Sequence, residues 1–115
     1  IKPFKESINM GVGSIMVSYN SWKGQKLHGP KYLINDVLKK ELGFDGIVVS
    51  DWAGINELDK DYKTCIIQSI NAGIDMNMVP GSLNPDDNSY DDFIRLAIES
   101  VKEGSIPMER IDDAV

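Results

Sequence analysis

Apolar residues along the chain fall into short unbroken runs that are separated by stripes with helical spacing. The runs cover residues 14–18, 46–50 and 74–79, and the middle one contains the β-branched triplet Ile47-Val48-Val49. An apolar run that does not alternate with polar residues is typical of a strand buried on both faces of a parallel sheet. The pattern therefore predicts three parallel strands near residues 14–18, 46–50 and 74–79.

Between these runs, apolar residues recur every three to four positions. This spacing predicts helices over residues 3–11, 30–42, about 58–72, about 90–103 and from 107 onward, and a polar loop over residues 23–30. The strand–helix units repeat at about thirty residues, which is the spacing of βα building blocks. The predicted fold class is α/β. Three such strands cannot close a barrel and leave two sheet edges unpaired, so we expect further strands elsewhere or association.

Composition narrows the range of partners and cofactors. The chain has 115 residues, is 42% hydrophobic, and carries a formal net charge of -6 with scattered acidic residues. It can bury the core of one modest domain, and its charge predicts binding neither to nucleic acid nor to a membrane surface. Its single cysteine, Cys65, excludes an internal disulfide or a cysteine-based zinc site. We expect no metal and no cofactor.

The termini predict a piece of a longer protein. The chain starts at Ile1 without an initiator Met or a signal-peptide layout, and it ends within an apolar stripe. No apolar run reaches the roughly 20 residues of a membrane-spanning helix.

The ends of the predicted strands carry the candidate chemistry. Tyr19 follows the first strand, Asp51 and Trp52 follow the second, and Asn77 lies near the end of the third. Catalytic groups of parallel α/β folds gather at the carboxyl ends of the strands, so Asp51 is a candidate catalytic acid. The alternative is that Asp51 only caps a helix or shapes a turn.

Two classes of α/β protein place a functional aspartate at a strand end. A phospho-accepting receiver domain fits the length, but it needs a carboxylate cluster for Mg²⁺, and the first strand here ends in Ser18-Tyr19-Asn20. A (β/α)8 TIM barrel draws its site from several strand ends. An acid among aromatic and polar groups suits a sugar, and its carboxylate can attack an anomeric carbon. The TIM barrel is the favoured interpretation.

Four further motifs accompany the Asp51 stretch and support a family assignment. The Asp51 stretch covers residues 43–52, and the others cover residues 16–24, 26–29, 72–76 and 110–115. In this order they resemble the family 3 glycoside hydrolases, the β-glucosidases and β-glucan exohydrolases. The resemblance implies that the chain, residues 1–115, is the C-terminal part of the TIM-barrel catalytic domain, about its last three βα units.

The resemblance also implies a mechanism. Asp51 would be the nucleophile of a retaining, exo-acting β-glucosidase, forming a covalent glycosyl-enzyme, and Trp52 and Tyr19 would line the sugar site. The substrate would be a β-glucoside or β-glucan oligosaccharide. The remaining sugar-binding residues would lie in the rest of the barrel, and the acid/base glutamate in a following domain. We therefore expect the isolated chain to have no more than trace activity.

Two alternatives stay open. One is a β-N-acetylhexosaminidase of the same family, a branch that usually carries a second aspartate where this chain has Trp52. The other is a non-catalytic structural fragment.

The remaining polar and aromatic residues fit more than one role. Trp22 is a candidate wall of the sugar site or an anchor of its own loop. Asp75 is a candidate for contact with the substrate, although satisfaction of such a carboxylate by backbone amides is favoured. For His28, the only histidine, a structural role is favoured over proton transfer. Asp86 and Asp87 lack the spaced ligands of a Ca²⁺ loop.

Overall fold

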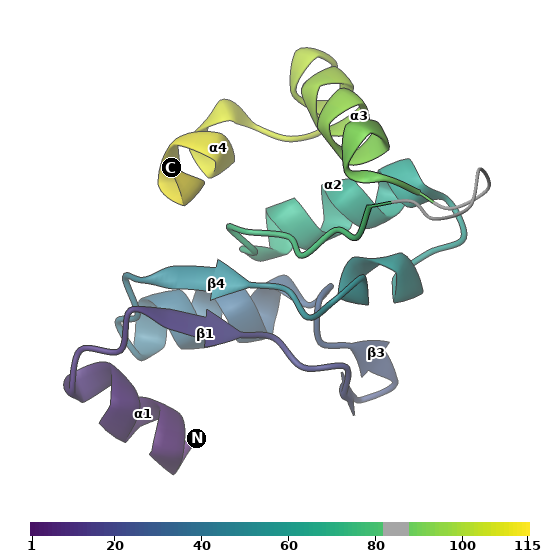
Figure 1. The fold of residues 1–115 in the computed structure, drawn as a ribbon. Coiled ribbons are helices and arrows are strands. Elements are labelled where there is room, and N and C mark those ends of the chain that lie inside the picture. The colour runs from purple at the N-terminus through teal and green to yellow at the C-terminus, as the bar shows by residue number, and fades with distance from the viewer. Residues whose placement is uncertain (82–87) are drawn as a thin grey trace.

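The computed structural model describes residues 1–81 and 88–115 of the chain (Figure 1). Most of the polar loop expected after residue 80 lies outside the described residues. The elements follow one another as α1 (Lys2–Asn9), β1 (Ser14–Met16), β2 (Ser21–Trp22), β3 (Gln25–Lys26), η1 (Tyr32–Glu41), β4 (Ile47–Val49), η2 (Gly54–Glu57), α2 (Tyr62–Ala72), α3 (Tyr90–Lys102) and α4 (Met108–Ala114).

The first two predicted strands form a parallel pair. Strands β1 and β4 align Ser14 with Ile47 and Met16 with Val49. A close backbone approach precedes the pair, because a Cβ atom added to Gly46 would lie 2.4 Å from the carbonyl oxygen of Gly13. Glycine at position 46 therefore lets the chain enter β4 beside β1. The prediction of an α/β fold with parallel strands is confirmed.

The third predicted strand, residues 74–79, forms only an isolated parallel bridge between Val49 and Met76. The backbone N–H of Ser50 donates to the carbonyl of Met76 at 2.9 Å. Beyond this point the N–H of Met78 donates to the side-chain Oγ of Ser50 at 2.8 Å. A side-chain acceptor thus replaces the next backbone partner, and the strand pairing stops. The segment lies beside β4 as predicted, but the prediction of a full strand is wrong.

A short antiparallel hairpin, β2–β3, occupies part of the region predicted as loop. Its pairs are Ser21 with Lys26 and Trp22 with Gln25. The turn residues Lys23 and Gly24 have φ angles of 50° and 78°. Two-residue hairpin turns of this left-handed kind match the twist of the flanking strands.

The helix predicted over residues 58–72 is divided in the structure. A 3₁₀ turn, η2, precedes it, and α2 starts only at Tyr62. Asp61 is the N-cap, and its carboxylate accepts the Thr64 N–H at 2.9 Å. This cap satisfies an N–H group of the first turn and fixes where the helix begins. The helix predicted over residues 30–42 is present as η1, a π-helix in which the N–H of Leu42 donates to the carbonyl of Val37.

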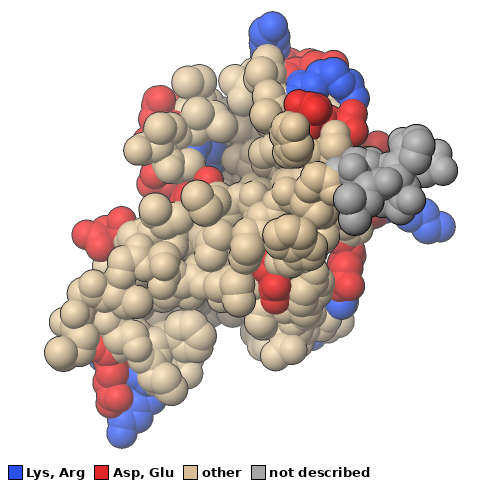
Figure 2. All heavy atoms as spheres, viewed as in Figure 1, with Lys and Arg blue, Asp and Glu red and all other residues tan. Residues whose placement is uncertain are grey.

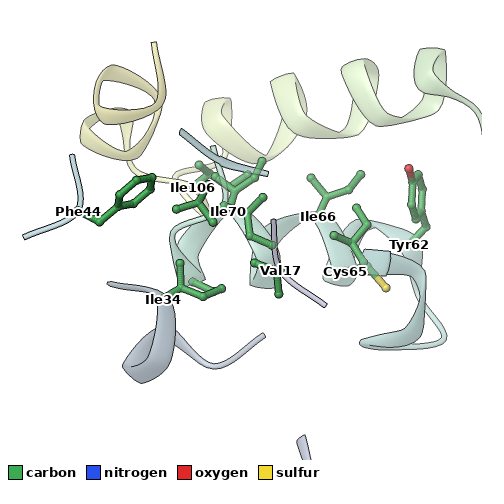
Figure 3. Packing of buried hydrophobic residues seen from close by; sticks show 12 residues of the cluster. Val17, Ile34, Phe44, Tyr62, Cys65, Ile66, Ile70 and Ile106 are labelled. Atoms are coloured by element: carbon green, nitrogen blue, oxygen red, sulfur yellow. The ribbon is translucent and has the colours of Figure 1, made fainter. Parts of the chain in front are cut away.

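Helix η1 covers one face of the β1–β4 sheet, and the other face is open. Figure 1 shows η1 behind the two strands, with α2, α3 and α4 stacked on the opposite side of β4 from β1. The buried cluster lies between these elements (Figure 3) and consists of Val17, Ile34, Phe44, Val48, Ile55, Tyr62, Cys65, Ile66, Ile70, Ala72, Ile74 and Ile106.

The open face of the sheet is apolar. Met16, Ile47 and Met76, one from each of the three segments, are 53%, 48% and 56% exposed. In Figure 2 the same side of the molecule shows mainly uncharged side chains, with most of the charged ones along the rim. We refer to Met16, Ile47 and Met76 as the open sheet face.

Candidate active site

Asp51 lies two residues after β4, and its backbone is held on both sides. Its N–H donates to Nε2 of His28 at 3.1 Å. Its carbonyl accepts the Ser50 hydroxyl at 2.9 Å and the Gly54 N–H at 3.0 Å. One carboxylate oxygen, Oδ1, accepts the Trp52 N–H at 2.7 Å. The position of Asp51 and the orientation of its carboxylate are therefore both fixed by hydrogen bonds.

The turn after Asp51 is tied to the segment beyond the Met76 bridge. Ala53 adopts a left-handed backbone with φ of 51°, and its N–H donates to the carbonyl of Met78 at 2.9 Å. The buried Ser50 hydroxyl accepts the Met78 N–H from the other direction. A left-handed alanine is uncommon, so the turn depends on these surrounding contacts.

His28 approaches Asp51 from the segment between β3 and η1. It is 1% exposed, and a Cβ atom added to Gly54 would lie 2.4 Å from its Nε2. Because Nε2 accepts the Asp51 N–H, the ring proton of the neutral imidazole belongs on Nδ1. Burial lowers the pKa of His28 below its ordinary value of 6.5, against the opposing effect of the Asp51 and Glu57 charges. His28 is therefore a neutral hydrogen-bond acceptor here.

Tyr19 completes a group with His28 and Asp51. The rings of Tyr19 and His28 lie 6.1 Å apart between centroids, at an angle of 59°. Burial raises the pKa of the Tyr19 phenol, and the charge of Asp51 raises it further. The phenol therefore stays protonated and remains a hydrogen-bond donor.

The two tryptophans named as candidates have different surroundings. Trp52 follows Asp51 directly and is 60% exposed. Trp22 stacks on Tyr32 with 6.0 Å between ring centroids, and Lys23 Nζ lies 4.6 Å from its ring centre. The structure therefore brings Trp52 next to Asp51 and places Trp22 against η1 and its own turn.

Asp75 is engaged away from this group. Its Oδ1 accepts Lys39 at 2.7 Å and Arg110 at 3.1 Å, and its Oδ2 accepts the Val48 N–H at 2.9 Å. Its side chain is 4% exposed. These contacts connect β4 to η1 and α4, and none of them involves Tyr19 or Asp51. A contact between Asp75 and substrate stays a prediction.

The contact that sequence reasoning missed is the one between His28 and Asp51. Its only signal was that His28 is the single histidine of the chain. In the described residues no group of three or more His, Cys, Asp or Glu side chains is arranged to hold a metal ion. Asp86 and Asp87 lie outside those residues. No helix in the described part is both long and apolar enough to cross a membrane.

Comparison with solved structures identifies enzymes that act on glycosides. An exo-1,3/1,4-β-glucanase from a Pseudoalteromonas species superposes with a TM-score of 0.81 at 42% identity, over 94% of this chain and 13% of that one. A β-glucosidase from Listeria innocua, solved in complex with glucose, gives a TM-score of 0.81 at 25% identity, over 96% of this chain and 15% of that one.

Comparison of sequences gives the same kind of relative. A β-glucosidase of Wickerhamomyces anomalus is 38% identical over 96% of this chain, and a periplasmic β-glucosidase of Salmonella typhimurium is 34% identical over 97% of it. The chain spans only 12% and 14% of the lengths of these two proteins.

The family profile described as "Glycosyl hydrolase family 3 N terminal domain" matches residues 1–115, the full length of the chain. The ordered motifs, the parallel β1–β4 pair and these relatives agree with that match. The chain belongs to glycosyl hydrolase family 3.

Proposed function

We propose that this chain is part of a retaining, exo-acting β-glucosidase in which Asp51 is the catalytic nucleophile. The observation that carries the proposal is the setting of Asp51: an acid after a parallel strand, with its backbone held by His28 and Ser50 and an exposed tryptophan next to it. Relatives named β-glucosidase and exo-β-glucanase make a terminal β-glucosyl residue the expected substrate group.

The proposal includes a place in a larger fold. Residues 1–115 would supply the last three βα units of an N-terminal TIM barrel. The segments β1, β4 and the Met76 bridge lie side by side in chain order, which supports this. The chain covers 12% and 14% of the two β-glucosidases compared above, so the remaining barrel strands and a following domain would complete the site.

The reaction follows from the position of the carboxylate. Oδ1 of Asp51 accepts the Trp52 N–H, which leaves Oδ2 to attack the anomeric carbon. The carbon–oxygen bond to the leaving group breaks as the bond to Asp51 forms, and a carboxylic acid about 5–5.5 Å away protonates the leaving oxygen. Water then attacks the same carbon, gives its proton to that second carboxylate and releases Asp51. Two displacements retain the configuration.

Trapping of the covalent intermediate tests this assignment. The full-length protein is treated with a 2-deoxy-2-fluoro-β-glucoside, which accumulates the glycosyl-enzyme, and the labelled peptide is mapped. We expect the label on Asp51 and its loss in Asp51→Asn. Asp45→Asn is the matched control, because Asp45 is an exposed acid that precedes the same strand. Label on any residue other than Asp51 would overturn the assignment.

A β-N-acetylhexosaminidase is the second candidate. A β-N-acetylglucosaminidase from Paenibacillus sp. FPU-7 has a TM-score of 0.76 at 28% identity over 97% of this chain. Trp52 favours the glucosidase, because the resemblance implies an aspartate at that position in the other branch. Comparing turnover of an aryl β-glucoside with that of the matching N-acetyl-β-glucosaminide separates the two.

The isolated residues 1–115 should show no more than trace activity. The proposal assigns the acid/base group to another part of the protein, and attack by Asp51 without protonation of the leaving group is slow. Turnover of an aryl β-glucoside by the isolated chain at the rate of its full-length relatives would contradict this division of the site.

A further inference from the structure

The hydrogen bond from the Asp51 N–H to His28 connects residues that are 23 positions apart. Neighbouring N–H groups find other partners: Ser50 donates to the carbonyl of Met76, Ala53 donates to that of Met78, and Trp52 donates to the Asp51 carboxylate. The Asp51 N–H lies where the strand pairing has stopped. The Asp51 N–H is partly buried, and Nε2 of His28 is its acceptor in this structure.

The imidazole is not explained by packing alone. Its Nδ1 is buried and has no hydrogen-bond partner in the part of the chain that the structure describes. A buried polar atom without a partner destabilises the fold, so an apolar side chain of similar shape would pack at lower cost. What histidine adds is therefore the acceptor at Nε2.

The surroundings also fix the position of that acceptor. Gly54 leaves no Cβ atom in the place that the imidazole occupies, since such an atom would lie 2.4 Å from Nε2. The Tyr19 ring also lies near His28, with 6.1 Å between the ring centroids. Burial keeps the imidazole neutral, as an acceptor requires.

We propose that His28 is a positioning residue for the nucleophile, holding the backbone of Asp51 so that its carboxylate points at the anomeric carbon. This inference rests on the function proposed above. His28 contacts neither the substrate nor the reacting atoms; it acts through the amide of Asp51. The effect belongs to the chemical step, because small misplacements of a reacting group lower the rate strongly.

Two substitutions in the full-length protein separate the acceptor from the volume of the side chain. The glutamine of His28→Gln can bring a carbonyl oxygen close to the place of Nε2, whereas His28→Leu fills the space without an acceptor. We expect His28→Leu to lower kcat by about tenfold to a hundredfold with KM changed by less than about threefold, and His28→Gln to recover most of kcat. The rate of labelling by the fluoroglucoside should follow kcat.

The outcomes are distinguishable. An equal loss of kcat in folded His28→Leu and His28→Gln would overturn the positioning role, and so would full activity in His28→Leu. Either result leaves the label on Asp51 in the unsubstituted protein and so leaves the proposed function standing. Failure to label Asp51 in the unsubstituted protein would overturn the proposed function itself.

Gly54→Ala provides a second test that keeps His28. The added methyl group must displace the imidazole from the Asp51 N–H. We expect the same selective loss of kcat, with folding checked by circular dichroism. If His28→Leu does not fold, Gly54→Ala alone tests the positioning role. Unchanged kcat in folded Gly54→Ala would overturn that role.

Discussion

Trp52 and Trp22 present the same side chain in two settings. Trp52 is mostly exposed beside the nucleophile candidate, whereas Trp22 has an aromatic partner in Tyr32 and a cation above its ring. An exposed indole next to an acid offers an unoccupied apolar surface to a sugar ring. An indole that is already stacked on another side chain of the protein offers less free apolar surface to a sugar.

The two tryptophans therefore form a matched pair for substitution. In the full-length protein we expect Trp52→Ala to lower kcat/KM for an aryl β-glucoside by about tenfold to a hundredfold, the effect of losing about one to three kcal/mol of sugar contact. Trp22→Ala should change kcat/KM by less than about threefold. Steady-state kinetics measure both, and a larger loss in Trp22→Ala would place the sugar against the hairpin instead.

His28 makes stability depend on pH. Its pKa in the folded protein lies below 6.5, because burial disfavours the charged imidazole. As the pH falls below 6.5, the unfolded chain takes up a proton before the folded one does, so stability falls until the folded pKa is reached. The titratable groups that face His28 are Asp51, Glu57, Lys26 and Tyr19. They are present both in the unsubstituted protein and in His28→Gln, so they contribute to the pH dependence of stability in both.

His28→Gln removes the titrating imidazole and should reduce the loss of stability as the pH falls below 6.5. The thermal midpoint of the full-length protein, measured at about pH 7.5 and about pH 5.5, should fall more in the unsubstituted protein than in His28→Gln. Equal changes in the two proteins would show that His28 does not titrate differently on unfolding.

At the scale of single residues, the sequence predicted the role of Asp51 but not its hydrogen bond with His28. Asp51 is the first acid after an unbroken apolar run, and that position can be recognised from the sequence alone. The contact with His28 depends on how the segment before η1 folds back onto the end of β4. No periodic pattern connects positions 28 and 51, so only the three-dimensional structure reveals it.

At the scale of elements, a buried ion network fastens β4 to two helices. Asp75 lies at its centre, with Lys39 from η1 and Arg110 from α4 on one carboxylate oxygen. Asp113 of α4 also contacts both cations. Arg110 extends the network by donating to the carbonyls of Ile70 and Ile74. These bonds hold the end of α2 and the start of the Met76 segment against α4.

Removing the central charge should destabilise the fold more than removing a surface one. Asp75→Asn leaves Lys39 and Arg110 at largely buried positions with only the exposed Asp113 as a counter-charge, and we expect a loss of about 3 kcal/mol of unfolding free energy. Asp36→Asn, in the exposed pair with Lys40, should change it by less than about 0.5 kcal/mol. Urea unfolding measures both changes in unfolding free energy. Equal changes would mean that the ion network does not stabilise the attachment of β4 to the two helices.

The elements that a sequence pattern specifies locally were predicted, and those set by competing contacts were not. Strands β1 and β4 follow from their apolar runs, and α3 and α4 from their stripes. The third strand is cut short by the Ser50 hydroxyl, and the start of α2 is delayed by the Asp61 cap. The Lys23-Gly24 turn carried a hairpin signal in its glycine, but the flanking strands have two residues each, too short to show alternation.

At the scale of the whole molecule, the open sheet face is the surface through which association is expected. Three apolar side chains of aligned segments, Met16, Ile47 and Met76, are about half exposed. Clustered apolar side chains on a surface favour association. In the proposed barrel this face would point inward.

The isolated chain should therefore self-associate through this face. Light scattering after size-exclusion chromatography should show species larger than a monomer, and Met16→Lys should shift the distribution toward the monomer. Met10→Lys is the control, because Met10 is still more exposed but lies outside the face. A monomeric chain, or an equal response to both substitutions, would contradict this expectation.

The contact between Gly54 and His28 has a consequence for how this sequence can change over time. A side chain at position 54 and an imidazole at position 28 exclude each other from the same space, so the two positions cannot mutate independently. Gly54→Ala should be harmful beside His28 and nearly neutral beside a smaller residue at position 28 that can still accept the Asp51 N–H, such as Asn. Homologues with a larger residue at position 54 are therefore expected to lack histidine at position 28, a covariation that couples the two loops flanking the nucleophile.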